Sequence, residues 1–86
     1  MTRDEVRNLK KAVRQGNKEA AAKLLERSIE FGHRKLAVLR CIIAERLGVV
    51  LRIDQLLYCQ SAINDLSSDD VASILRQATN SVPRKS

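Results

Sequence analysis

The feature that most constrains the fold is the stretch from Arg34 to Asp65, which contains no proline and a single glycine, Gly48. From Leu36 onwards its aliphatic residues recur at the spacing of a helix face. One glycine inside a helix costs only about 1 kcal/mol relative to alanine, which a well-packed helix tolerates. The sequence therefore predicts one long helix over this stretch.

Shorter helices are expected on both sides of it. Gly16 and Asn17 together indicate either the end of one helix and the cap of the next or a mild bend, and Gly32 marks a turn. Ser67 or Ser68 can cap a last helix, whose first turn carries two aspartates that suit the positive helix end. The first expected helix is capped by Thr2 or Asp4 and runs to about residue 15, and the others cover residues 18–31, 34–65 and 71–79.

The chain length limits the fold to one domain with a small core. A chain of 86 residues buries only roughly 60% of the surface that it exposes when unfolded. The long helix has a wider apolar arc than two short neighbours can cover, and a two-fold dimer would cover it. The expected fold is all-α: a helical hairpin with one long helix plus a short C-terminal helix, assembled as a dimeric four-helix bundle. Residues 1–80 would form the domain and 81–86 a basic flexible tail.

Charge favours an acidic partner. The net charge is +6 and the calculated isoelectric point about 9.9, which is typical of proteins that bind nucleic acid or anionic surfaces. Phe31 and Tyr58 are the only aromatic residues, so the chain lacks the platforms on which single-stranded bases stack.

Enzyme chemistry is not indicated. His33 has no nucleophile or carboxylate constellation beside it in sequence, and there is no glycine-rich phosphate loop. Cys41 and Cys59 lack zinc-ligand spacing and fall in apolar helical pattern, so we expect buried reduced thiols. Neither a signal peptide nor a membrane span is apparent. We expect no catalytic or metal site, no cofactor, no membrane contact, no small-molecule substrate and a cytoplasmic location, in a host cell if the protein is viral.

The long helix offers a candidate RNA-binding surface. Arg34 and Arg52 are 18 residues apart, which is five turns, so they point the same way about 27 Å apart along the axis. Small residues such as Ala37, Cys41 and Ala44 lie between them, while Leu36, Leu39, Ile43, Leu47, Val50 and Leu57 would face the core. The small residues could simply pack against another helix, with the arginines at the ends of that contact. Alternatively, the two arginines clamp phosphates of duplex RNA, which proteins read by shape. The candidate RNA-binding set is Arg34, Lys35, Arg40, Cys41, Arg46 and Arg52.

Residues 34–57, RKLAVLRCIIAERLGVVLRIDQLL, resemble the small RNA-silencing suppressors of insect nodaviruses. The resemblance rests on an arginine at the start, Leu39, Val50 followed by Arg52, and Leu57. It implies an all-helical homodimer that lies along double-stranded RNA without sequence preference and shields it from dicing. The RNA-contacting arginines of that family would fall on Arg34 and Arg52, whereas Glu45 stands where the family has a lysine.

Two other interpretations remain open. The predicted first helix carries a basic stripe, which is either a solvated face, an extension of a nucleic-acid footprint or a weak contact for anionic lipid. The stripe consists of Arg3, Arg7, Lys10, Lys11 and Arg14. The main alternative function is a small helical protein-interaction module, such as an adaptor, antiactivator or chaperone, with the apolar arc as its partner groove. A helix-turn-helix is disfavoured because the helix after Gly32 is too long and too apolar.

Overall fold

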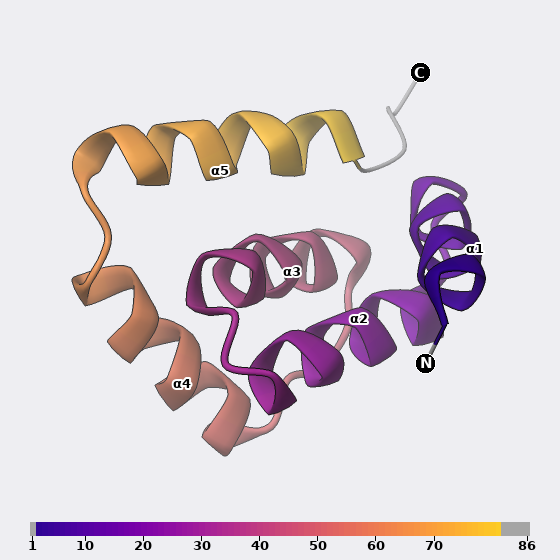
Figure 1. Ribbon diagram of the computed structural model, residues 1–86, viewed down its shortest axis with the longest axis horizontal. Helices are drawn as coiled ribbons and strands as arrows, with labels where there is room; N and C mark the ends of the chain where they lie inside the picture. The colour runs from indigo at the N-terminus through magenta and orange to yellow at the C-terminus, as the bar shows by residue number, and fades with distance from the viewer. Residues whose placement is uncertain (1, 82–86) are drawn as a thin grey trace.

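Capping side chains mark where three of the described helices begin. The computed structural model describes residues 2–81, and Figure 1 shows their arrangement. The helices are α1 (Arg3–Arg14), α2 (Lys18–Glu30), α3 (Arg34–Leu47), α4 (Ile53–Asn64) and α5 (Ser68–Ser81). Thr2, Asn17 and Ser67 each accept a hydrogen bond from a backbone N–H in the first turn of α1, α2 and α5. These caps confirm the predicted starts of the two N-terminal helices and the predicted cap of the last one.

The prediction of one continuous helix over residues 34–65 was wrong, because the chain leaves the helix at Gly48. This glycine has a φ angle of 86°, in the left-handed region that residues with a Cβ rarely adopt. Its N–H donates to the carbonyl of Glu45 at 3.0 Å, and the N–H of Val49 donates to Ala44 at 2.9 Å. This pair of hydrogen bonds is the Schellman motif, which satisfies the last carbonyls of a helix and ends it.

α4 then folds back against α3, so that the end of α4 lies near the start of α3. Arg34, the first residue of α3, forms an ion pair with Asp65, which follows α4. The reversal buries Cys59 and Ala62 of α4, which are 3% and 2% exposed. A small chain gains more from covering its own apolar surface in this way than from one extended helix.

α3 is the central helix and packs against α2, α4 and α5 (Figure 1). α1 packs mainly against α2 and stands at the edge of the molecule opposite α4. The radius of gyration is 12.2 Å, close to the roughly 12 Å expected for a compact domain of this length. The expected helical hairpin and the four-helix bundle shared by two chains are therefore corrected: one chain supplies all five helices of an all-α globule.

The core face of the central helix differs from the expected one. The small residues that we placed between two RNA-binding arginines are buried, among them Ala37, Cys41 and Ala44 at 0%, 7% and 0% exposure. They pack inside the protein, as the simpler of the two interpretations held. Val50 and Leu57, which we placed on the core face, are instead exposed. The break at Gly48 rotates everything after it out of the predicted register.

The last helix is longer than predicted, because α5 runs from Ser68 to Ser81 instead of over residues 71–79. Residues 82–86, which include most of the predicted basic tail, lie outside the described residues. Within residues 2–81, no helix has both the length and the apolar character needed to cross a lipid bilayer.

Candidate anion-binding surface

The basic face of α1 is formed by five cations that project from one side of the helix. Helical geometry places all five within an arc of about 100° and spreads them over roughly 17 Å of the axis. Val6, Leu9 and Val13 lie on the other side and pack against the core. The members of the basic face are Arg3, Arg7, Lys10, Lys11 and Arg14, and all are exposed.

No carboxylate neutralises this face within the part of the chain that the structure describes. The ion pairs within 4 Å there join other residues, and none involves a cation of α1. The two acids of α1, Asp4 and Glu5, are confined to the first turn, where they favour the positive helix end. The last two turns of α1 therefore present positive charge only.

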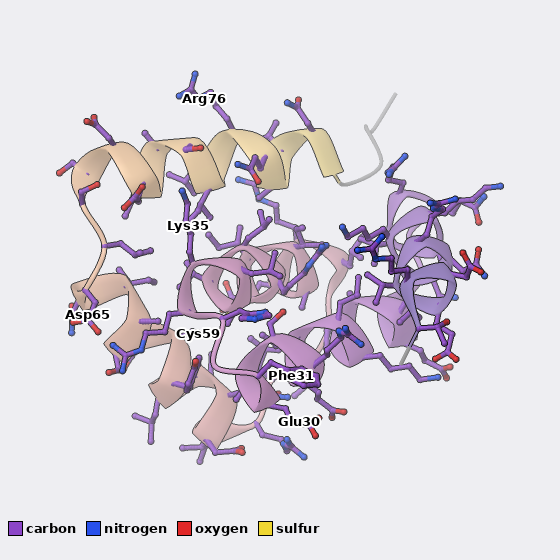
Figure 2. The ribbon with its side chains drawn as sticks, in the orientation of Figure 1. Glu30, Phe31, Lys35, Cys59, Asp65 and Arg76 are labelled. Atoms are coloured by element: carbon purple, nitrogen blue, oxygen red, sulfur yellow. The ribbon has the colours of Figure 1, made fainter. Side chains whose placement is uncertain are left out.

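Three of the six predicted RNA-binding residues are engaged with acids. Arg34 pairs with Asp65, and the ammonium of Lys35 lies 3.3 Å from the carboxylate of Asp70 at the start of α5. Figure 2 shows Lys35 directed from α3 toward α5. Arg52 precedes the first residue of α4, where its Nε lies 3.4 Å from Asp54. Arg34 and Arg52 thus stand at the starts of two different helices, so the geometry of one shared helix face does not exist.

The other three predicted residues have different surroundings. Arg46 is exposed and donates from Nη1 to the hydroxyl of Thr79 on α5 at 2.9 Å. Cys41 lies in a small core cluster with Leu25 and Cys59, away from solvent. Arg40 is only 7% exposed, which is unusual for a charged side chain.

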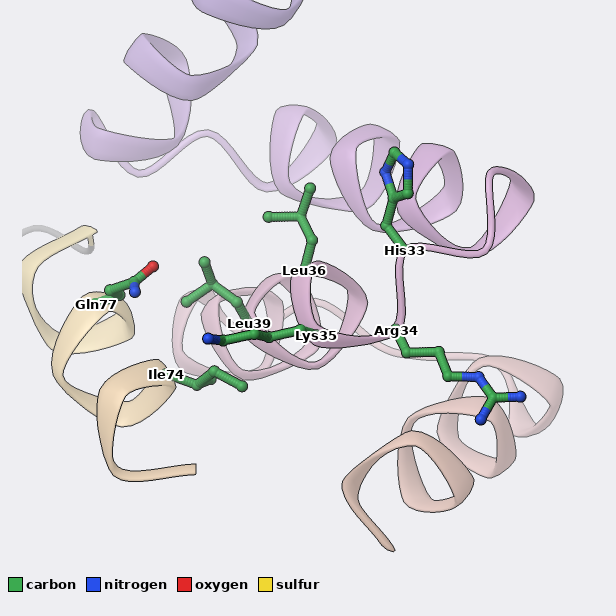
Figure 3. A pocket seen from close by; sticks show the side chains of 7 residues that line it. All are labelled: His33, Arg34, Lys35, Leu36, Leu39, Ile74 and Gln77. Carbon is green, nitrogen blue, oxygen red and sulfur yellow. The ribbon is translucent and has the colours of Figure 1, made fainter. Parts of the chain in front are cut away.

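An apolar pocket lies between the start of α3 and α5 (Figure 3). It has a volume of about 360 Å³, and Leu36, Leu39 and Ile74 supply its apolar lining. The close-up shows Lys35 extending toward α5, whereas Arg34 turns toward α4. His33 and Gln77 are the remaining residues of the lining. None of the residues that line this pocket is an acid.

A second hollow adjoins this pocket where α1, α3 and α5 meet, and we call it the Arg40 hollow. Its volume is about 250 Å³. Three cations line it. It shares Leu36, Leu39 and Gln77 with the apolar pocket beside it. The lining residues are Lys10, Val13, Arg14, Leu36, Leu39, Arg40 and Gln77. Hollows around α2 differ in containing acids, such as Glu26 and Glu30 beside Arg27.

Arg40 stands out among the buried polar side chains of residues 2–80. Ser28 donates its hydroxyl to the carbonyl of Leu24 at 2.9 Å, and Gln55 accepts from the N–H of Arg52 at 3.1 Å. The Nε of Arg40, by contrast, is buried without a hydrogen-bond partner. Burial lowers the pKa of Arg40 from its ordinary value, and no described carboxylate offsets that effect. A buried N–H of a charged group that has no partner is costly, so this side chain is suited to an anion supplied from outside.

Both cysteines are buried, as predicted, and the structure places them together in one core cluster. Both are free thiols, and the Sγ of Cys59 lies 3.9 Å from the carbonyl oxygen of Ala37. A hydrogen bond to Cys59 and burial both raise the pKa of the Cys41 thiol. Among the described residues, no three His, Cys, Asp or Glu side chains come close enough to hold a metal ion.

The stripe on the first helix follows from the sequence, but its relation to Arg40 does not. The spacing of Lys10 and Arg14 places them on one face of α1. Arg40 is 26 residues further along the chain than Arg14, and only the packing of α1 beside α3 and α5 brings the three together. A cation inside an otherwise apolar run, Ala37 to Ala44, is the local signal that could have drawn attention to it.

Comparison with known protein families, with curated proteins and with solved structures finds nothing that matches this chain. The comparisons lend no support to the resemblance to nodavirus suppressors, which stays a prediction.

Proposed function

We propose that this protein binds the phosphate backbone of nucleic acid, without sequence preference, through the basic face of α1. The observation that carries the proposal is the set of five exposed cations on that face, none of which a described carboxylate neutralises. Lysine and arginine bind backbone phosphates mainly through charge and carry no sequence information in doing so. Lys10 and Arg14 of this face also line the adjoining Arg40 hollow, to which α3 contributes one further cation, Arg40.

A duplex is favoured over a single strand as the ligand. Single-strand binding draws much of its free energy from stacking of bases on aromatic rings. Phe31 is at the end of α2, where the guanidinium of Arg27 lies 5.1 Å from its ring centre. Figure 2 shows Phe31 well away from α1, and Tyr58 of α4 packs against the cluster of Leu25, Cys41 and Cys59. The basic face therefore has neither ring beside it as a stacking platform.

Duplex RNA, the ligand expected from the sequence, remains our proposed form of nucleic acid. Double-stranded RNA is recognised largely by its shape, through phosphates and 2′-hydroxyls, and a basic helix face suits that mode. The proposed contact no longer depends on Arg34 and Arg52, since acids engage both. A role in suppressing RNA silencing stays a prediction, because it rested on the resemblance and on no site of this protein.

Titration with nucleic acids of random sequence tests the proposal. Duplex RNA, duplex DNA and single-stranded RNA of equal length are titrated at two salt concentrations, with fluorescence anisotropy as the readout. We expect duplex RNA to bind most tightly, and its affinity to fall steeply as salt rises. Equal affinity for single-stranded and duplex RNA would contradict the preference for a duplex.

Matched charge variants locate the contact. The variant Arg3→Gln/Arg7→Gln/Lys11→Gln removes three cations from the basic face of α1. The control Lys23→Gln/Arg52→Gln/Arg76→Gln removes three exposed cations from α2, the start of α4 and α5. We expect the first variant to flatten the slope of log affinity against log salt by about 2 to 3, and the control to change it little. If the control loses as much affinity as the α1 variant, general charge explains the binding and this site does not.

A second candidate function is binding of another protein chain through α4. Ile53 and Leu57 are one turn apart on α4 and are 76% and 60% exposed, and Val50 just before them is 94% exposed. Adjacent exposed apolar side chains are typical of a protein contact, and a second copy of this chain would form the homodimer expected from the sequence. Sedimentation equilibrium of the protein and of Ile53→Glu/Leu57→Glu tests this. A monomeric mass for both proteins contradicts the homodimer.

A further inference from the structure

The Arg40 hollow combines a deep cation with two cations at its edge. Arg40 supplies the deep group, since its side chain is more than nine-tenths buried and its Nε has no hydrogen-bond partner. Lys10 and Arg14 reach the same hollow from α1 and are exposed, so they can adjust to a ligand. No acid lines the hollow to compete for these groups.

The surroundings strengthen the attraction of the hollow for an anion. Val13, Leu36 and Leu39 provide apolar walls, and charge interactions are stronger beside such walls than in open water. The guanidinium of arginine is planar and donates two parallel hydrogen bonds to the oxygens of a phosphate. A group with several oxygens and up to two negative charges matches three cations better than chloride or a single carboxylate does.

We propose that the Arg40 hollow binds one phosphate group, with Arg40 as the buried donor and with Lys10 and Arg14 closing over it from α1. The site goes beyond the proposed function, because it binds a phosphate group by itself and does not require a nucleic-acid chain. The group can be free phosphate or one phosphate of a nucleic-acid backbone, since the recognised chemistry is the same.

Thermal unfolding with inorganic phosphate as the probe tests the site. Phosphate is exchanged for chloride at constant pH and ionic strength, so that only specific binding changes the melting temperature. At ten times its dissociation constant, a ligand of the native state should raise the melting temperature of a domain this size by about 5 to 10 °C. No difference between phosphate and matched chloride would overturn the proposal.

Variants assign the effect to Arg40. Arg40→Met keeps most of the apolar side chain and removes the charge, so it should fold at least as stably in chloride and lose the phosphate-dependent shift. Arg76→Met is the matched control, because Figure 2 shows Arg76 directed away from the body of the protein. Lys10→Met/Arg14→Met changes only exposed side chains and should weaken phosphate binding by about tenfold or more. A full phosphate shift in this double variant or in Arg40→Met would overturn the assignment.

Competition distinguishes the two sources of the phosphate group and separates this proposal from nucleic-acid binding. If the hollow holds a backbone phosphate, inorganic phosphate at its own dissociation constant displaces duplex RNA more than matched chloride does. If it holds a free phosphate, duplex RNA binding is unchanged. The variant Arg3→Gln/Arg7→Gln/Lys11→Gln spares the hollow, so it should lose duplex binding and keep the phosphate shift. Loss of one property without the other then identifies which proposal has failed.

Discussion

Arg34 at the start of α3 forms an ion pair with Asp65 at the end of α4. The contact places the end of α4 beside the start of α3. The chain therefore reverses its direction between the two helices. Both side chains are more than half exposed, at 61% and 54%, so the pair contributes little to stability. The pair does, however, fix Arg34 at the start of a helix that does not contain Arg52, so the two arginines do not share the helix face on which the predicted phosphate clamp depended.

Gly48→Ala distinguishes the observed break from a continuous helix by the sign of its effect. Inside a helix, alanine would stabilise the protein by about 1 kcal/mol relative to glycine. At the observed φ of 86°, an added Cβ is strained and would lie 3.5 Å from Nζ of Lys18, so we expect a loss of about 1 to 2 kcal/mol. Urea denaturation measures the change, and a more stable variant would contradict the break.

Leu25→Ala and Leu57→Ala make the same chemical change at buried and exposed positions. Leu25 is 0% exposed and packs with Cys41 and Cys59, so its truncation should cost about 2 to 5 kcal/mol. Leu57 is 60% exposed, and its truncation should stay within about 0.5 kcal/mol. Both values come from chemical denaturation. A large loss at Leu57 in dilute monomeric protein would show that the sequence-based core assignment of this residue was right.

The buried thiols should resist modification in the folded protein. The raised pKa of Cys41 keeps its thiol protonated, and burial of Cys59 limits access. We expect a thiol reagent at pH 8 to react at least about 100-fold more slowly in native protein than in urea. The variant Ala72→Cys places a thiol at an exposed position of α5 and serves as the reactive control. Equal rates at all three thiols would contradict the packing of α3 against α4.

Lys35→Met should raise the pKa of Asp70. Hydrogen bonds from Lys35 and Ser67 hold the pKa of Asp70 below its ordinary value in the folded state. A carboxyl whose folded pKa is lowered adds stability above the unfolded pKa of about 4, and this contribution disappears as pH falls through the lowered value. An NMR titration of the Asp70 carboxyl carbon measures the shift. Arg76→Met is the control, and an unchanged Asp70 in the Lys35 variant would refute the contact.

The starts of α1, α2 and α3 and the ends of α1 and α2 could be predicted from local chemistry. Asn17 and Ser67 are strong caps whose partners lie three residues away, and short-range hydrogen bonds of this kind depend little on the rest of the fold. The prediction of a continuous helix failed at Gly48. Glycine costs little inside a helix, but it is also the residue best suited to the left-handed conformation that ends one. The hydrogen bonds that end α1 at Gly16 and α2 at Gly32 follow the same pattern as those at Gly48.

The candidate site could be predicted only in part. The stripe on α1 follows from helical spacing alone, so sequence was sufficient to find it. The surroundings of Arg40 depend on how α1, α3 and α5 pack, and those helices are far apart in the chain. Once the helix broke at Gly48, Arg34 and Arg52 lost their common face, and nothing local to either residue signalled that.

The basic face belongs to a helix that packs mainly against one neighbour. Mutual repulsion among its five positive groups opposes their close arrangement, and dissolved counter-ions weaken that repulsion. We therefore expect α1 to pack less firmly against the remaining helices in dilute buffer and more firmly when electrolyte is added. Slower amide hydrogen exchange in α1 at high ionic strength, with α3 unaffected, would reveal an N-terminal segment whose order is set by the surrounding solution.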